Sequence, residues 1–209
     1  MKIFAISDIH GNKNIFEQLN NVDCDLIVIC GDLGGKYFAS LNRLSELQLE
    51  ETKQNLDLIK KPFKFILGND DWFDLKHINY LEQETVIQNE LFIPFEYVNI
   101  TPFNTNREVN ENKLRYELSK ISNNGIIVAH TPPYNCGDKV YSNEHVGSKS
   151  VREWILYNQP KIWLNGHIHE DFGVSNIKDT LIFNCSCNDK LQGWLIDTNT
   201  LDYNVYKLD

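Results

Sequence analysis

Several short apolar runs in this chain are each followed at once by aspartate, asparagine or histidine. Runs such as 2–7 and 25–30 are rich in Ile and Val and are typical of buried strands. A polar residue at the carboxyl end of a parallel strand opens onto a crevice rather than onto the core. Five runs end this way, at Asp8-Ile9-His10, Gly31-Asp32, Gly68-Asn69-Asp70-Asp71, Ala129-His130 and Gly166-His167-Ile168-His169. We therefore expect these side chains to meet at one site.

The first half of the chain alternates strand and helix patterns. We predict strands over 2–7, 25–30 and 62–67, with helices near 12–21 and within 38–60. Short crossovers of this kind indicate a parallel sheet. The stretch 72–109 is less regular, and we predict two short strands there around Pro94, over 91–95 and 97–100.

The second half continues with a helix near 110–122 and strands over 125–129 and 161–165. Ser150 with Glu153 three residues later predicts a capping box that opens a helix to about Tyr157. From Phe172 to Leu208 short alternating runs are separated by turn residues, which predicts antiparallel strands. Together these elements predict two packed sheets with outer helices.

Length and composition place the chain among ordinary globular proteins. Its 209 residues, 42% of them hydrophobic, predict one domain over 1–209 with a substantial core. No run is long enough to cross a membrane, and Asp8 interrupts the apolar N-terminal run, so we expect a first strand rather than a signal peptide and a cytoplasmic location. The net charge of −9 has no basic block, which disfavours stable nucleic-acid binding.

The five cysteines form no C-x-x-C pair. We predict that Cys24, Cys30, Cys136, Cys185 and Cys187 are reduced thiols, most of them buried. Cys185 and Cys187 are expected on one face of a strand, because side chains repeat every second residue. A zinc or redox role is the alternative to simple burial.

The strand-end residues have the chemistry of a two-metal hydrolytic centre. Such a site needs a bridging carboxylate and neutral imidazoles. Asp32 is the candidate bridge, because the glycines beside it allow a tight turn. Asp8, His10 and His169 would complete one metal site, and Asn69, His130 and His167 the other. This oxygen and nitrogen set suits Mn²⁺, the ion we expect, with Fe, Zn, Co or Ni as alternatives to it.

Taken singly, each of these residues has a simpler explanation. A lone aspartate or histidine at a strand end is more often a helix cap or a hydrogen-bonded turn residue. Only the complete ordered set predicts a metal centre.

The ordered set resembles the calcineurin-like metallophosphoesterase superfamily. The matching blocks are Asp8-x-His10-Gly11, Gly31-Asp32-x-x-Gly35, Gly68-Asn69, His130 and Gly166-His167-x-His169. The resemblance implies an α/β fold of four layers, two mixed sheets flanked by helices, with two divalent metals. It also implies hydrolysis of phosphate esters by a metal-bridging hydroxide. The motif His130-Thr-Pro-Pro and the compact length are similar to the small bacterial and archaeal phosphodiesterase-like branch.

One position departs from the superfamily pattern. The third block usually reads Gly-Asn-His, and here Asp70 stands in place of that histidine. The histidine helps to stabilise the transition state or protonates the leaving oxygen. Close to two cations Asp70 should stay ionised and be a poor acid, so we expect preference for diesters or activated esters. The predicted catalytic residues are Asp32, Asn69, Asp70 and His130.

Other polar and aromatic residues have weaker claims. Asp71 is expected to orient a ligand. Asp138 and His145, in the loop after His130, could face the substrate or simply be solvated. Further candidates whose structural explanation is the simpler one are Arg152 for a phosphate, Trp72 and Phe73 as pocket walls, and His77, which is expected at the surface.

The expected substrate is a phosphate-ester small molecule or nucleotide, and the sequence does not name it. A binding scaffold that keeps the fold without turnover is the alternative from another class, and a nuclease is the enzymatic alternative. The complete ligand set argues against the scaffold.

Overall fold

Two large sheets form the centre of the protein in a computed structural model, which describes residues 1–187 and 190–208. The first sheet has five strands in the order β13-β12-β1-β2-β3. Their bounds are Lys2–Ile6 (β1), Leu26–Cys30 (β2), Phe63–Ile66 (β3), Gln192–Asp197 (β12) and Tyr203–Lys207 (β13). Strands β1, β2 and β3 run parallel, as the short crossovers predicted.

The second sheet has six strands in the order β10-β11-β9-β8-β5-β4. Their bounds are Thr85–Ile87 (β4), Glu90–Phe95 (β5), Ile126–Ala129 (β8), Ile162–Asn165 (β9), Gly173–Ile177 (β10) and Thr180–Asn184 (β11). A small separate sheet pairs Val98–Asn99 (β6) with Glu108–Val109 (β7). The predicted antiparallel tail is confirmed but divided, since β10–β11 pair in the second sheet and β12–β13 in the first.

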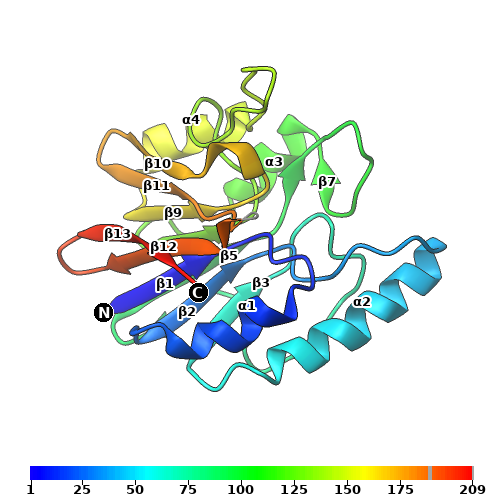
Figure 1. The fold of residues 1–209 in the computed structure, drawn as a ribbon. Coiled ribbons are helices and arrows are strands. Elements are labelled where there is room, and N and C mark those ends of the chain that lie inside the picture. Colours follow the sequence, from blue (N-terminus) through cyan, green and yellow to red (C-terminus); the bar gives the residue numbers. More distant parts are fainter. Residues whose placement is uncertain (188–189, 209) are drawn as a thin grey trace.

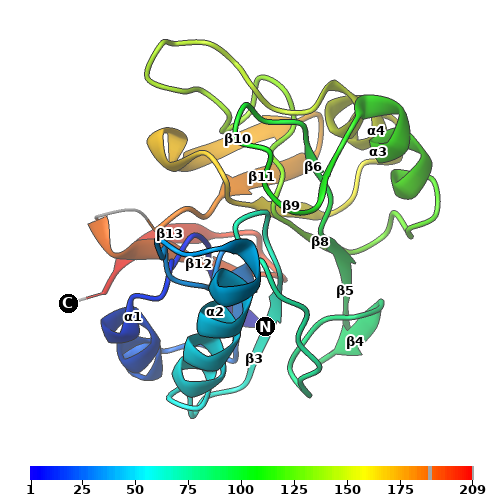
Figure 2. The same ribbon diagram turned by 90° about the vertical axis from the view of Figure 1, so that its right-hand side faces the viewer.

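Helices cover the outer face of each sheet. Helices α1 (Lys13–Gln18) and α2 (Leu41–Leu56) lie on the first sheet, and α3 (Glu111–Leu118) and α4 (Lys149–Asn158) lie on the second, as Figures 1 and 2 show. Single turns of 3-10 helix occur at Leu19–Asn21 and His169–Asp171. The four-layer fold implied by the family resemblance is therefore the observed one.

Three apolar clusters fill the spaces between these layers. The inner faces of the two sheets bury residues such as Val28, Ile126 and Phe183 against one another. The outer clusters hold residues such as Phe16 beneath the first sheet and Trp163 beneath the second. At roughly 1.5–3 kcal/mol for each fully buried large apolar side chain, these clusters supply the main driving force for folding. Because these clusters occupy the space between the layers, the polar candidate residues lie at the strand ends instead.

The irregular stretch differs in detail from its prediction. Pro94 lies inside β5 and pairs in register with Val128 of β8. The neighbouring strand β4 ends its pairing at Phe92, so β5 has only one partner at Pro94 and the missing N–H is tolerated. The second predicted strand shortens to Val98–Asn99.

The predicted capping box of α4 was wrong. Ser148 is the N-cap, and its side chain accepts a hydrogen bond from the N–H of Val151. Ser150 lies inside the helix and donates its hydroxyl to the carbonyl of Glu111. Glu153 pairs with Arg115 of α3. Both residues of the expected capping box therefore contact α3 instead of capping α4.

The expectation that Cys185 and Cys187 share a strand face was also wrong. Strand β11 ends at Asn184, and the chain then crosses from the second sheet to the first. Cys185 packs between the sheets, and Cys187 packs in the cluster under the first sheet. None of the five cysteines forms a disulfide, as predicted. Among the described residues, no helix has both the length and the apolar character needed to span a membrane.

Candidate metal centre

The carboxyl ends of the two sheets meet where glycines let the backbone approach closely. Ser7, just after β1, accepts the N–H of Cys187 and donates its own N–H to Cys185, which hydrogen-bonds the first sheet to the second. A Cβ added at Gly166 would lie 2.0 Å from Ser7 Oγ, and one at Gly68 would lie 2.2 Å from Asp32 Oδ1. Only glycine fits at these two positions, so the candidate ligands are held on touching backbones.

Asp8 is buried at this junction and is held from several sides. Its carboxylate accepts hydrogen bonds from the Ser186 hydroxyl, at 2.6 Å, and from the backbone N–H of His167. Burial raises the pKa of Asp8, but the His169 hydrogen bond and the His130 charge outweigh it and hold this pKa well below its usual range. Asp8 is therefore a fixed carboxylate.

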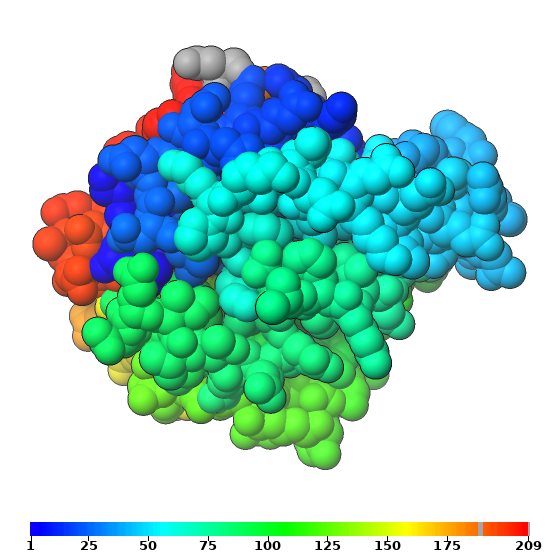
Figure 3. Space-filling model, turned by 90° about the horizontal axis from the view of Figure 1, so that it is seen from below, coloured from blue at the N-terminus to red at the C-terminus, as the bar shows by residue number. Residues whose placement is uncertain are grey.

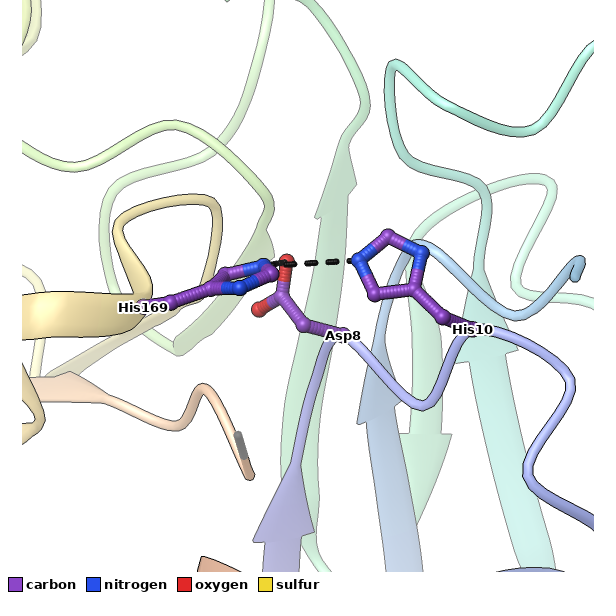
Figure 4. A group of neighbouring side chains, drawn as sticks. All are labelled: Asp8, His10 and His169. Carbon is purple, nitrogen blue, oxygen red and sulfur yellow. Dashed lines mark hydrogen bonds and ion pairs between the residues drawn. The ribbon is translucent and has the colours of Figure 1, made fainter. Parts of the chain in front are cut away.

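His10 and His169 lie on either side of Asp8 with their rings turned toward each other (Figure 4). The two Nε2 atoms are 3.4 Å apart, and His169 Nε2 is 3.2 Å from Asp8 Oδ1. Burial lowers the pKa of His10, which keeps its imidazole neutral at pH 7. These three residues, which the sequence assigned to one metal, thus lie close together.

Asp32 lies between this trio and the remaining predicted ligands. Its Oδ2 is 3.9 Å from His10 Nε2 and 3.3 Å from His130 Nε2. The ring of His130 is oriented by Cys30, whose carbonyl lies 2.7 Å from Nδ1. A carbonyl only accepts, so Nδ1 carries the proton and Nε2 faces the carboxylates. Burial disfavours the imidazolium, yet the Asp32 carboxylate outweighs that effect and raises the pKa of His130 to about 10.

Asn69 and His167 complete the second set, with Asn69 Oδ1 at 2.7 Å from His167 Nδ1. Burial, and then the charge of His130, lower the pKa of His167 to about 4, so this ring is neutral at pH 7. The amide of Asn69 is oriented by Thr105, whose Oγ1 accepts from Nδ2 at 2.7 Å. Thr105 in turn donates its hydroxyl to Glu108. This chain of bonds directs Asn69 Oδ1 into the site.

The two acidic residues after Asn69 have different places. Asp71 is buried, and its carboxylate accepts backbone N–H groups of Leu33, Gly34 and Gly68, so it joins the turns after β2 and β3. Burial, and then Asp32, raise the pKa of Asp71 to about 7. Asp71 thus orients the turns that carry candidate ligands.

Asp70 faces the candidate ligands directly. Its Oδ2 lies 3.9 Å from His10 Nδ1, and its Oδ1 accepts the indole N–H of Trp72. Without bound ions, burial and then Asp32 raise the pKa of Asp70, which is the reverse of the effect that cations would have.

The donor set fits divalent cations. His130 Nε2 and His10 Nδ1 are buried and make no hydrogen bond among the described residues, although the Asp32 and Asp70 carboxylates lie 3.3 Å and 3.9 Å from them. Groups of atoms spaced for a shared ion include Asp8 with His10 and His169, Asp8 with Asp32 and His130, and His10 with Asp32 and Asp70. Buried imidazole nitrogens without partners are costly unless a proton or a metal ion meets them. Carboxylate, amide and imidazole donors without thiolate suit Mn, Fe, Zn or Co.

Five of the seven candidate ligands line a cleft of about 760 Å³, and Asp8 and His130 are buried behind them. Its lining includes Asp32, Asn69, Asp70 and the histidines at 10, 167 and 169, together with Lys36 and Glu170. Phe103, Thr105 and the segment Val140–Ser142 form the rest of the wall, with Ile168. The polar groups thus face a space large enough for a phosphate ester.

Several weaker candidates lie elsewhere. Asp138 is buried and accepts the N–H groups of Asn135 and Gly147, and its Oδ1 pairs with His145 Nδ1 at 2.6 Å. Both residues support the loop after β8 and do not line the cleft. Arg152 donates to the carbonyl of Tyr134.

The aromatic candidates also have structural places. Phe73 packs in the core under the first sheet, whereas Trp72 donates its indole N–H to the Asp70 carboxylate. His77 is partly buried against Phe63 and Phe65 rather than simply exposed.

Sequence reasoning missed the residues that support the site from a distance. Ser186, Thr105 and Arg107 are the main ones, the last donating to the carbonyls of Gly68, Asp71 and Phe73. Serine and threonine after apolar runs are too common to stand out. Arg107 carried no signal, because its partners lie more than thirty residues away in the chain.

The fold and this cluster of donors define a metallophosphoesterase-type protein. The sequence model of the calcineurin-like phosphoesterase family matches residues 1–171, and the chain belongs to that family.

The chain is also similar to curated proteins and, in fold, to solved structures. The chain is 30% identical over 206 residues to the uncharacterized protein MJ1162 of Methanocaldococcus jannaschii, covering 89% of this chain and 88% of that protein. It is 25% identical to the UPF0046 protein K07C11.7 of Caenorhabditis elegans, over 90% of this chain and 70% of that protein. The fold is similar to that of TT1561 of Thermus thermophilus, with a TM-score of 0.67, 14% identity and coverage of 100% and 99%. A dimetal phosphatase from Danio rerio is similar in fold at a TM-score of 0.57, with 12% identity and coverage of 88% and 86%.

Substitution of Gly166 tests whether the touching backbones build the centre. In Gly166→Ala the new methyl would lie 2.0 Å from Ser7 Oγ and 2.4 Å from Asp8 Oδ2, so Asp8 must move. We expect the affinity for Mn²⁺ to fall at least about tenfold, equivalent to ~1.4 kcal/mol, in a calorimetric titration. Gly173→Ala is the control, because its nearest contact would be 3.8 Å away. Equal affinities in the two variants would contradict the argument.

Substitution of Thr105 tests the orientation of Asn69. Thr105→Val keeps the shape but removes the acceptor of the Asn69 amide. We expect a loss of about 10- to 100-fold in metal affinity or turnover, as is typical when a group that orients a ligand is removed. Thr101→Val is the matched control, since Thr101 also donates to Glu108, at 2.6 Å, and has no bond to Asn69. Wild-type metal binding and turnover in Thr105→Val would show that Asn69 needs no such support.

Proposed function

We propose that the chain is a phosphoesterase that uses two divalent ions to hydrolyse phosphodiesters or activated phosphomonoesters. The observation that carries the proposal is the convergence of two donor sets on Asp32. Asp8, His10 and His169 form one set, and Asn69, His130 and His167 form the other. Mn²⁺ is the ion we propose, with the same alternatives as before.

The ions would supply a hydroxide nucleophile near neutral pH and offset the charge of the phosphoryl oxygens. Asp32 would serve both sets, since its Oδ2 lies near His10 and His130, while its Oδ1 accepts the N–H of Asp70 at 2.8 Å. Cys30 holds the His130 ring so that Nε2 points inward. Hydrolysis of a diester consumes one water and gives a monoester and an alcohol, so the leaving oxygen needs a proton or must tolerate its charge.

The cleft supports a small ester better than a nucleic acid. Lys36 is the one lysine or arginine among the lining residues described above. A nuclease groove needs several cations along the phosphate backbone, because phosphate contacts supply most of the affinity. No observation in the described residues favours a nuclease.

Metal analysis with an ester assay tests the proposal. Protein loaded with Mn²⁺ should hold two ions per chain, unfold at a higher temperature than the metal-free form, and hydrolyse bis-p-nitrophenyl phosphate. Asp32→Asn should lose hydrolysis at least about 100-fold, since removing one group from a charge-stabilising site typically costs that much. Asp23→Asn, at an exposed position, is the control. No bound metal and no hydrolysis with any divalent ion would favour the binding scaffold.

Asp70 offers a second test of the same chemistry. An ionised carboxylate only accepts hydrogen bonds, whereas a histidine can donate one to the leaving oxygen. We expect Asp70→His to raise the rate on unactivated esters about 10- to 100-fold and to change the rate on p-nitrophenyl esters little, since such leaving groups need no acid. Asp74→His, at an exposed neighbour, is the control. Similar wild-type rates on both kinds of ester, with no gain in the variant, would contradict this role.

A further inference from the structure

Two aromatic side chains stand exposed at the rim of the metal cleft. Phe103 is 79% and Tyr141 86% exposed, and both line the cleft that holds the candidate ligands. Single exposed apolar residues are ordinary on protein surfaces. Two large rings in the wall of one polar cleft are different, because both line the same space as the candidate ligands.

Both rings are carried by loops with internal support. Tyr141 is at the tip of a hairpin in which Val140 donates to Glu144 at 3.0 Å and Asn143 donates to Val140 at 2.8 Å. The buried Asp138 closes the base of this hairpin. Phe103 donates its N–H to Thr101 Oγ1, and Thr101 is held by Glu108. Hydrogen bonds within each loop therefore fix its conformation. The Tyr141 loop follows β8 of the second sheet, and the Phe103 loop connects β6 to β7.

A second apolar hollow adjoins the cleft on the side of the first sheet. It has a volume of about 340 Å³ and is lined by Lys36, Tyr37, Phe38, Leu44, Gln48 and Asp70. Lys36 and Asp70 also line the metal cleft, so the two spaces lie next to each other and share these two side chains. Phe38 is fully exposed. The segment around the start of α2 projects from the body of the molecule, in light blue in Figure 3.

The cleft that holds candidate ligands therefore has two exposed rings in its wall, and Asp70 and Lys36 also line a hollow with apolar side chains on the opposite half of the sandwich. A phosphomonoester has one organic arm and could use only one of these two surfaces, whereas a diester has two arms. Resting on the proposed function, we propose that the site binds phosphodiesters that carry a planar apolar group on each arm. Phe103 and Tyr141 would contact one group, and Tyr37, Phe38 and Leu44 would contact the other.

Three inert diesters of equal charge separate the contributions of the arms. Dimethyl phosphate has no ring, methyl phenyl phosphate has one and diphenyl phosphate has two. Their affinities are measured by calorimetry on metal-free and Mn²⁺-loaded protein, and as competitive inhibition of bis-p-nitrophenyl phosphate hydrolysis. We expect affinity to rise about three- to tenfold with each ring, the range typical of aromatic pairs.

The variants assign each step to a surface. Phe103→Ala combined with Tyr141→Ala should remove the gain in affinity from one ring. Phe38→Ala should remove the gain from the other ring. All three side chains are exposed, so folding is not at risk. Tyr157→Ala is the matched control, since Tyr157 is 78% exposed on α4 and lies outside both spaces.

The outcomes distinguish this inference from the proposed hydrolysis. Stepwise binding that both variants reduce supports the inference even if no ester is turned over. Equal binding of the three diesters overturns it even if hydrolysis is fast. A single step, or steps that the variants leave unchanged, also overturns the assignment of two arms to two surfaces.

Discussion

The close approach of backbone to backbone at the strand ends is the constraint on which the rest of the structure depends. Gly31 has a φ of +96°, and a Cβ there would lie 2.8 Å from Gly68 Cα and 2.7 Å from His130 Nδ1. Gly166 meets Ser7 in the same way. Because these glycines touch, side chains from both sheets reach one point. Longer side chains at the glycine positions would separate the sheets and disperse the candidate ligands.

Around that point, supporting residues hold the candidate ligands in place. Cys30 fixes the His130 ring, Ser186 fixes the Asp8 carboxylate, and Thr105 fixes the Asn69 amide. Each of these bonds leaves one donor atom directed inward. A site built in this way keeps its geometry before any ion arrives, which lowers the ordering cost of binding. The loops at the rim are held by their own hydrogen bonds and not by the candidate ligands, so their side chains can change without moving the ligands.

Much of the fold and of the candidate site could be predicted, because both follow from local patterns. An apolar run fixes a strand, and the residue after it must emerge at the sheet edge, so Asp8, Asp32 and His130 could be placed without coordinates. Long-range contacts were not predictable. The chain crosses between the sheets at Cys185 and Cys187 because it pairs with Ser7, which is distant in the sequence. Ser150 likewise donates its hydroxyl to Glu111, in a different helix. The role of Arg107 belongs to the same class.

Four of the candidate ligands have left-handed backbone conformations: Asp8, His10, Asp32 and His167 have φ values between +47° and +73°. Such conformations are strained for residues other than glycine, at roughly 1–3 kcal/mol each. Glycine at any of these positions would relax the backbone and delete a donor atom. Substitutions to glycine would therefore stabilise the fold and remove donor atoms from the candidate site. Aspartate and histidine at these positions keep the donor atoms at the expense of stability.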